Sequence, residues 1–199
     1  MYAFYSYEGD FTEGFLGNPK DFNGIVFLLK EPNDPEGAKT FWFKEIENNF
    51  DGYFIRSKED ADKITKEKRV ASKFINRFTE LLEIVGLGSR EDLGNAVFCN
   101  INPQGGGCTA GEIYKQKLET VPPVMLPYLA TLRKEITIFT CTEIYERLKK
   151  LSVFENQITE DGIEYKGGKL KCTRGEVNGT KVCVYAIYHP SARKTLIVK

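Results

Sequence analysis

The sequence predicts an α/β fold with three layers, in which helices cover both faces of a central four-stranded parallel sheet. Four short apolar runs supply the strands, because each is nearly continuous and rich in β-branched residues, as expected for strands buried on both faces. Helical patterns lie between the runs, and right-handed crossovers between consecutive strands make such a sheet parallel. The predicted strands cover residues 25–29, 96–99, 136–139 and 182–187.

The longest predicted helix begins near Ala71 and ends at Gly86, a residue that readily stops a helix. Its apolar residues follow the three-and-four spacing of an amphipathic helix. Two further helices are predicted to begin at capping boxes, Thr109-x-x-Glu112 and Thr140-x-x-Glu143. The apolar positions of the long helix are Phe74, Ile75, Phe78, Leu81, Leu82 and Val85.

Residues 158–177 contain Asp161-Gly162 and Gly167-Gly168, which are turn signals, and predict a small inserted hairpin. A chain of 199 residues without internal repeats fits one domain, and we interpret residues 1–199 in that way.

Composition excludes several classes of protein. Apolar residues make up 41% and aromatic residues 13%, which is enough for a buried core. The longest unbroken aliphatic or aromatic run has five residues, far short of the roughly 20 that cross a bilayer, and the N-terminus does not resemble a secretory signal. We therefore expect a cytoplasmic protein without a membrane partner.

The cysteines and the single histidine argue against metal and disulfide sites. Five cysteines are scattered without a C-x-x-C motif, so we expect reduced thiols and neither a disulfide framework nor a zinc site. His189 has no second histidine to share a metal ion with. The cysteines are Cys99, Cys108, Cys141, Cys172 and Cys183.

Charge is balanced overall but separated along the chain. There are 28 basic and 28 acidic residues. Residues 1–60 carry 12 acidic and 6 basic side chains, a net of −6, whereas residues 166–199 carry 8 basic and 1 acidic, a net of +7. This separation favours a basic face that could meet phosphates, with an ordinary solvated surface as the alternative.

Polar residues follow the predicted strands, at the edge where open α/β sheets bind ligands. Glu31 follows the first strand and precedes Pro32. Asn100 follows the second strand and carries a donor and an acceptor on one planar group, as reading a nucleobase edge requires. His189, which titrates near neutral pH, follows the fourth strand. Taken singly, His189 is as typical of a structural residue as of a functional one, Glu31 is more typical of an ordinary turn carboxylate, and Asn100 has a turn residue as its alternative.

Together the three positions resemble the uracil-DNA glycosylase superfamily. The matching motifs are Leu29-Lys-Glu-Pro-Asn33, Val97-Phe-Cys-Asn100 and Tyr188-His-Pro-Ser191, in this order and each after a predicted strand. The resemblance covers roughly residues 24–192. It implies a single domain that hydrolyses the N-glycosidic bond of uracil or another deaminated base flipped out of DNA. It also implies a monomer that needs no cofactor.

The resemblance assigns a role to each matching residue. His189 would donate a hydrogen bond to O2 of the departing base, a stabilisation worth about 3 kcal/mol. Asn100 would pair with N3–H and O4, and Glu31 would position or activate water. Phe43, with its neighbour Trp42, would stack on the base.

Other positions would support binding. Arg193 and Lys194 would contact DNA phosphates or the minor groove. The remaining residues that would line the substrate site are Pro32, Asn33 and Ser191.

The sequence also departs from the family, which leaves alternatives open. Leu29-Lys30 stands where the family has glycine, and Glu31 replaces Asp or Asn. No cysteine precedes Cys99, so the iron–sulfur ligands of some branches have no counterpart. Lys30-Glu31 favours a non-catalytic nucleotide- or nucleic-acid-binding protein on the same scaffold. A flavodoxin-like protein is a third interpretation, although no phosphate-binding loop follows Leu29.

Overall fold

The computed structural model describes residues 14–15, 22–30, 66–102, 111–160, 162–165 and 168–188. The helices are α3 (Lys66–Val85), the 3-10 helix η3 (Arg90–Asn95), α4 (Glu112–Thr120), α5 (Pro122–Leu132) and α6 (Thr142–Leu148). The strands are β1 (Gly14–Phe15), β2 (Ile25–Leu29), β3 (Val97–Asn100), β4 (Glu135–Cys141), β5 (Glu155–Glu160), β6 (Glu164–Tyr165), β7 (Gly168–Lys169), β8 (Cys172–Val177) and β9 (Thr180–Ile187).

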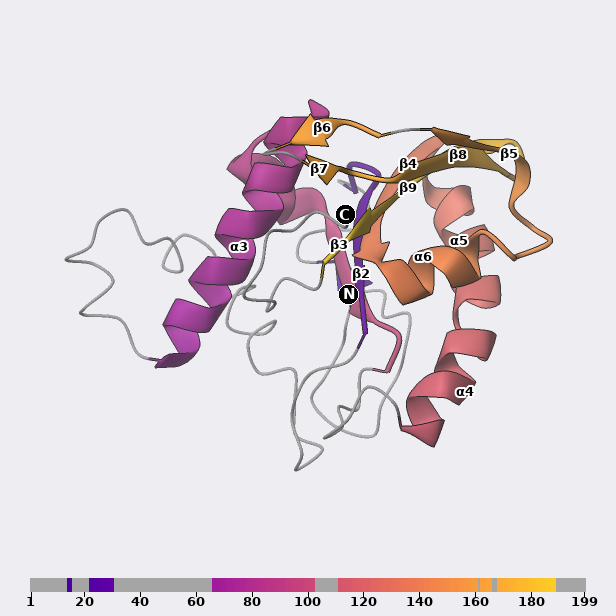
Figure 1. Cartoon of the computed structure of the whole chain (residues 1–199), viewed down its shortest axis with the longest axis horizontal. Helices are drawn as coiled ribbons and strands as arrows, with labels where there is room; N and C mark the ends of the chain where they lie inside the picture. The colour runs from indigo at the N-terminus through magenta and orange to yellow at the C-terminus, as the bar shows by residue number, and fades with distance from the viewer. Residues whose placement is uncertain are drawn as a thin grey trace.

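The described strands form a seven-stranded mixed sheet in the order β1-β3-β2-β4-β9-β8-β5 (Figure 1). The four predicted strands correspond to β2, β3, β4 and β9, and they pair with one another in parallel. The α/β class is therefore confirmed. A sheet of four strands is wrong, because β1 adds antiparallel to β3, and β8 and β5 continue the sheet antiparallel beyond β9.

The predicted inserted hairpin is part of this extension. Residues 158–177 contribute to β5 and β8, which belong to the main sheet, while β6 and β7 pair as a separate two-stranded ribbon. A two-residue turn, Asn178-Gly179, connects β8 to β9, and both of its residues have positive φ, 50° and 76°. Asn-Gly is the dipeptide that best fits such a turn, because both positions need left-handed backbone. The turn holds β8 beside β9 and so enlarges the sheet.

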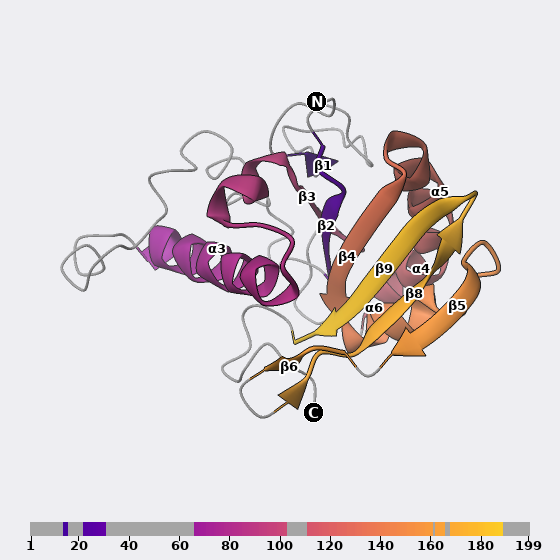
Figure 2. The same ribbon diagram turned by 90° about the horizontal axis from the view of Figure 1, so that it is seen from above.

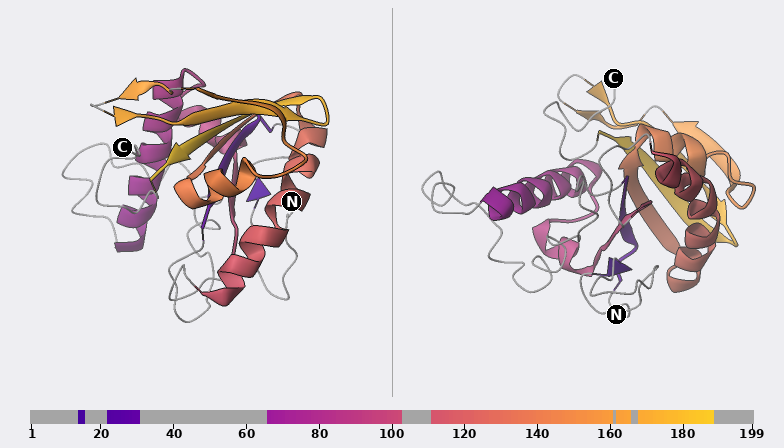
Figure 3. Two further views of the ribbon diagram at one scale, coloured as in Figure 1. Left: turned by 45° about the vertical axis from the view of Figure 1, so that its right-hand side comes forward. Right: turned by 90° about the horizontal axis from the view of Figure 1, so that it is seen from below.

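Helices cover the sheet on both faces (Figures 1 and 2). On one face α3 buries Phe78, Leu81 and Leu82 against β2 and β3. On the other, α4, α5 and α6 pack on the sheet and bury, among others, Tyr114 and Tyr145. Figure 3 shows α3 and the α4–α6 group on opposite sides of the strands. Each face therefore has its own apolar core.

Aromatic rings form a row across the parallel strands on the α3 face. The Phe27 ring centroid lies 4.8 Å from that of Phe98 in β3 and 5.2 Å from that of Phe139 in β4. Phe139 stacks in turn on Tyr185 of β9 at 5.4 Å, and Phe78 of α3 covers Phe27 at 4.2 Å. These residues are register partners in the sheet, so the row joins four strands at one level.

The helix predictions are partly correct. Helix α3 ends before Gly86, whose φ of 69° fits a helix terminus, although the helix begins earlier than predicted. The second capping box is wrong, because α6 begins at Thr142 after the N-cap residue Cys141. Thr140 belongs to β4 instead, and its hydroxyl donates a 2.6 Å hydrogen bond to the Leu28 carbonyl of β2.

The first predicted capping box fails in a different way. Helix α4 begins at Glu112, with Gly111 at the N-cap and no side-chain hydrogen bond there. Thr109 lies outside the described residues. Glu112 is thus the first residue of the helix and not its third, as the box requires.

Among the described strands, β5 forms one outer margin of the sheet. All six of its residues are exposed, and its pairing with β8 shifts register between Glu155 and Ile158. Asn156 lies within the shift and has a φ of 52°, in the left-handed region that asparagine tolerates better than most residues. The strand therefore bends away from regular extended geometry at this point.

None of the helices in the described ranges combines the length and the hydropathy of a membrane span. The interpretation of residues 1–199 as one domain and the expected cytoplasmic location stay predictions.

Replacing Phe27 tests the importance of the aromatic row. Phe27 is 0% exposed and contacts rings on both neighbouring strands and on α3. We expect Phe27→Ala to lower the free energy of unfolding by about 3–5 kcal/mol in urea titrations, through lost burial and the cavity left behind. Val124→Ala, at a position 72% exposed on α5, should cost less than about 0.5 kcal/mol. Equal effects of the two changes would contradict the assigned core.

Candidate functional site

The four parallel strands end at the same level of the sheet. Leu29 of β2 pairs with Asn100 of β3, and Cys141 of β4 pairs with Ile187 of β9. The segments that follow β2 and β3 stay side by side beyond the strands. The Ile101 amide donates to the Leu29 carbonyl at 2.8 Å, and the Asn102 amide donates to the Lys30 carbonyl at 2.9 Å. The polar residues that follow these strands in the sequence therefore start from one edge.

The connectivity makes this edge the expected place for a ligand. The chain passes from β2 to β3 on one side and returns to β4 on the other side of β2. Such a reversal of strand order opens a crevice beyond the carboxyl ends of the two central strands, where open α/β sheets bind ligands. Here those strands are β2 and β4.

Asn100 is the one predicted site residue within the described ranges. It is the last residue of β3 and only 2% exposed. Side chains alternate along a strand, and Phe98 packs in the core beneath α3, so Asn100 faces that same side. A carboxamide in this position is enclosed by protein and lies at the carboxyl edge.

Lys30 lies at the same edge but faces the opposite side of the sheet. Its Nζ is 2.6 Å from Oε2 of Glu143 in α6, and the Tyr114 hydroxyl of α4 donates to that same oxygen at 3.3 Å. The ammonium group also lies 5.8 Å from the Tyr114 ring centroid. Because α4 and α6 cover the face opposite α3, the charge of Lys30 is neutralised away from the side that Asn100 faces.

Cys141 ends β4 close to the same crevice. Burial raises the pKa of its thiol above the ordinary value, although a hydrogen bond from the Ile144 backbone opposes the rise. A thiol with a raised pKa stays protonated near neutral pH and is a poor nucleophile. Cys141 is therefore a structural residue at the start of α6.

The other predicted site residues lie outside the described residues. In sequence, Glu31 directly follows Lys30, and His189 directly follows Tyr188. The strand ends that precede them, in β2 and β9, are separated by one intervening strand, or about 10 Å. Convergence of these side chains with Asn100 stays a prediction. The other positions outside the described ranges are Pro32, Asn33, Trp42, Phe43, Ser191, Arg193 and Lys194.

Sequence reasoning missed the Lys30, Glu143 and Tyr114 cluster. The sequence pattern places Glu143 in a capping box, and Lys30 stands out only where the family motif has glycine. The available signal was positional, since residues of opposite charge follow two neighbouring strands by one and two positions. Only the order of the strands shows that the two positions are neighbours.

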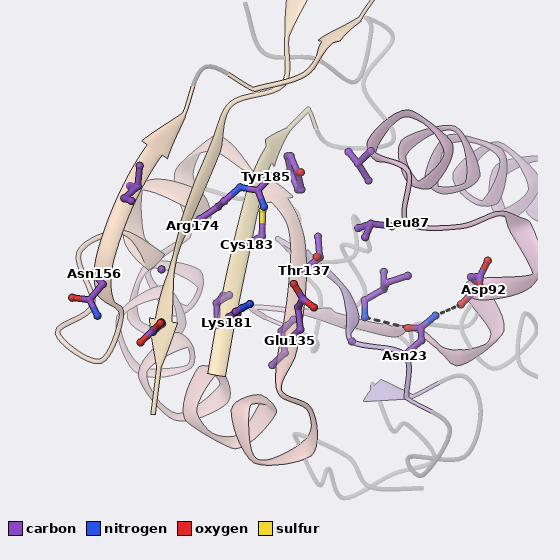
Figure 4. A pocket seen from close by; sticks show the side chains of 18 residues that line it. Asn23, Leu87, Asp92, Glu135, Thr137, Asn156, Arg174, Lys181, Cys183 and Tyr185 are labelled. Carbon is purple, nitrogen blue, oxygen red and sulfur yellow. Dashed lines mark hydrogen bonds between the residues drawn. The ribbon is translucent and has the colours of Figure 1, made fainter. Parts of the chain in front are cut away.

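A cavity of about 600 Å³ lies elsewhere, on the α3 side of β4, β9, β8 and β5 (Figure 4). It is lined toward the amino ends of β2 and β4 by Asn23, Glu135 and Thr137, and toward β8 and β9 by Arg174 and Cys183. Asn100 does not line it. The cavity and the carboxyl-edge site are thus separate features.

The described ranges contain no group of three histidine, cysteine or acidic side chains placed to hold a metal ion. Comparisons of the chain with protein-family models, with curated proteins and with solved structures give no match.

A double-mutant cycle measures the ion pair at the carboxyl edge. Lys30 and Glu143 side chains are 23% and 45% exposed, so solvent weakens their attraction. We expect Lys30→Gln and Glu143→Gln to show a coupling of about 0.5–1 kcal/mol in unfolding free energy. The coupling should shrink in about 1 M salt, where the screening length is short. A coupling near zero at low salt would show that the two side chains do not act as a pair.

Proposed function

We propose that the protein is a DNA glycosylase-like hydrolase that flips uracil or another deaminated base from DNA and cleaves its N-glycosidic bond. The observation that carries the proposal is the buried Asn100 at the carboxyl end of β3, level with the ends of β2 and β9. Glu31 and His189 follow those two strands in the sequence. The three motifs that resemble the uracil-DNA glycosylase superfamily therefore start from one edge of one sheet.

The burial of Asn100 suits selection of a base. A carboxamide offers a donor and an acceptor in one plane; held with its oxygen toward N3 and its NH2 toward position 4 of the base, it matches N3–H and O4 of uracil but opposes the N3 and N4 groups of cytosine. A wrong base would leave these buried groups unpaired, which a buried site penalises more than an exposed one. The 2% exposure of Asn100 thus favours recognition over simple surface contact.

The spacing of the strands fits a base held between side chains. Asn100 in β3 and the end of β9 are three strand spacings apart, about 14 Å. Two side chains that reached inward from those ends would leave room for one planar ring. In the proposed reaction His189 stabilises negative charge on the departing base and Glu31 positions the attacking water.

The placement of Lys30 removes one argument for a binding protein without catalysis. An ammonium group beside the flipped base would disturb the charges expected in a glycosylase site. Lys30 instead pairs with Glu143 on the face opposite Asn100. Its presence in the first motif is therefore compatible with hydrolysis.

Release of free base from a labelled oligonucleotide tests the proposal. We expect uracil release by the wild-type protein, a loss of about 10²–10³ in rate for His189→Ala, and a loss of about 10–100-fold for Asn100→Ala. Asn95→Ala, which changes an exposed asparagine in η3, is the matched control and should retain full activity. Thermal unfolding of each variant separates loss of activity from loss of structure.

Two results would overturn the proposal. One is the absence of release of uracil, hypoxanthine, xanthine or a mismatched base at high protein concentration. The other is release that is unaffected by both Asn100→Ala and His189→Ala. Binding of abasic, single-stranded or duplex DNA in fluorescence anisotropy, without turnover, would support the non-catalytic binding protein instead.

A further inference from the structure

Two cysteines lie in contact on the α3 side of the outer half of the sheet. Cys172 in β8 and Cys183 in β9 have their Sγ atoms 3.1 Å apart, and both are free thiols. They occupy diagonal positions, since Cys172 pairs with Tyr185 and Cys183 pairs with Arg174 in the ladder. Their closeness follows from the pairing of β8 with β9, which no cysteine spacing in the sequence indicates.

The two thiols differ in access. Cys172 is 1% exposed, whereas Cys183 is partly buried and lines the cavity of about 600 Å³ described above. Figure 4 shows Cys183 in the cavity wall, beside Arg174 and Tyr185. A small molecule that enters the cavity therefore meets Cys183 first.

Neighbouring charges and hydrogen bonds also make the pKa values of the two thiols differ. The hydrogen bond with Cys172 lowers the pKa of Cys183, helped by the Tyr185 hydroxyl and by the charge of Arg174, while burial acts in the opposite direction. The same hydrogen bond, together with burial, raises the pKa of Cys172. Glu160 also faces the pair, but its carboxylate binds Arg174 at 2.8 Å. Cys183 is therefore the better nucleophile of the two.

We propose that Cys172 and Cys183 form a site of thiol–disulfide exchange, which accepts a low-molecular-weight disulfide in the cavity and closes reversibly to a bond between β8 and β9. The proposal is independent of the glycosylase function. It is carried by the sulfur contact, the unequal access of the two thiols and the cavity beside one of them.

The exchange takes place in two balanced steps. The Cys183 thiolate attacks one sulfur of the small disulfide, breaks its S–S bond and releases one thiolate, which leaves a mixed disulfide on Cys183. Formation of the mixed disulfide removes the Cys183 thiolate, whose hydrogen bond with Cys172 is the main cause of the raised Cys172 pKa. Cys172 then loses its proton to solvent and attacks the Cys183 sulfur, and the second small thiolate departs. Both small thiolates take up protons. The protein thiols are oxidised by two electrons and the small disulfide is reduced to two thiols.

The bond that forms should be easy to reduce. The sulfur atoms must approach by about 1 Å to reach the bonding distance of about 2.05 Å. Diagonal residues of a ladder are usually about 7–8 Å apart between Cα atoms, farther than most disulfides span, so closure requires the strands to shift. Strained disulfides of this kind are labile and are reformed and broken under mild conditions.

Mass spectrometry of the full chain after treatment with oxidised glutathione tests the site. We expect the wild-type protein to lose two hydrogens and to give a Cys172–Cys183 cross-link on peptide mapping, reversed by dithiothreitol. Cys172→Ser should stop at a stable glutathione adduct on Cys183, whereas Cys183→Ser should acquire neither adduct nor cross-link there. Cys141→Ser, at a buried thiol remote from the cavity, should react like the wild type.

An exposed charge gives a second test that does not disturb the core. Arg174 is 56% exposed, so Arg174→Gln should fold normally. The charge of Arg174 helps to lower the pKa of Cys183, so its loss should raise that pKa, reduce the fraction of thiolate and slow the exchange. Lys150→Gln, an exposed cation after α6, is the matched control and should not change the rate.

Three outcomes would overturn the proposal. They are the absence of a cross-link in the wild-type protein, a cross-link that maps to other cysteines, and glutathione adducts that form as fast on Cys183→Ser as on the wild type.

Discussion

Stacking of aromatic rings across the sheet sets the register of its parallel strands. Phe27 lies between Phe98 and Phe139, and Tyr185 continues the row onto β9. A slip of one residue in any of these strands would turn its ring from the α3 core to the opposite face, so burial strongly favours a single register. Because register fixes where each strand ends, the position of Asn100 at the carboxyl edge follows from packing deep in the core.

The polar residues at the carboxyl edge lie on different faces of the sheet. At the carboxyl edge, alternation of side chains directs Asn100 to the α3 side and Lys30 to the side of α4 and α6. Along the α3 side, the aromatic row meets the cysteine pair, since Tyr185 is the register partner of Cys172. The apolar core thus borders both the candidate base-binding residue and the candidate thiol site, at opposite ends of one continuous row.

Continuous apolar runs predicted the four parallel strands and their positions, because burial on both faces leaves a clear local pattern. The antiparallel strands β8 and β5 leave a weaker pattern in the sequence. Strand β5 is exposed at every residue, and β8 has only two apolar residues, Cys172 and Val177, one at each end, so neither strand forms an apolar run. The Asn178-Gly179 turn was the available signal for pairing of β8 with β9.

The predicted helix caps were wrong where a tertiary contact competed for the capping side chain. The Thr140 hydroxyl, for example, donates a hydrogen bond to the Leu28 carbonyl of β2 and does not cap α6. Of the predicted site residues, the structure places only Asn100.

The left-handed backbone at Asn156 has a consequence for how copies of the protein meet. An outer strand offers main-chain donors and acceptors that a neighbouring molecule could use to continue the ladder into a fibril. Here the shift of register at Glu155 to Ile158 interrupts that row, and acidic residues stand at both ends of the strand. Both features make β5 a poorer template for a second molecule than a long, regular and uncharged outer strand would be.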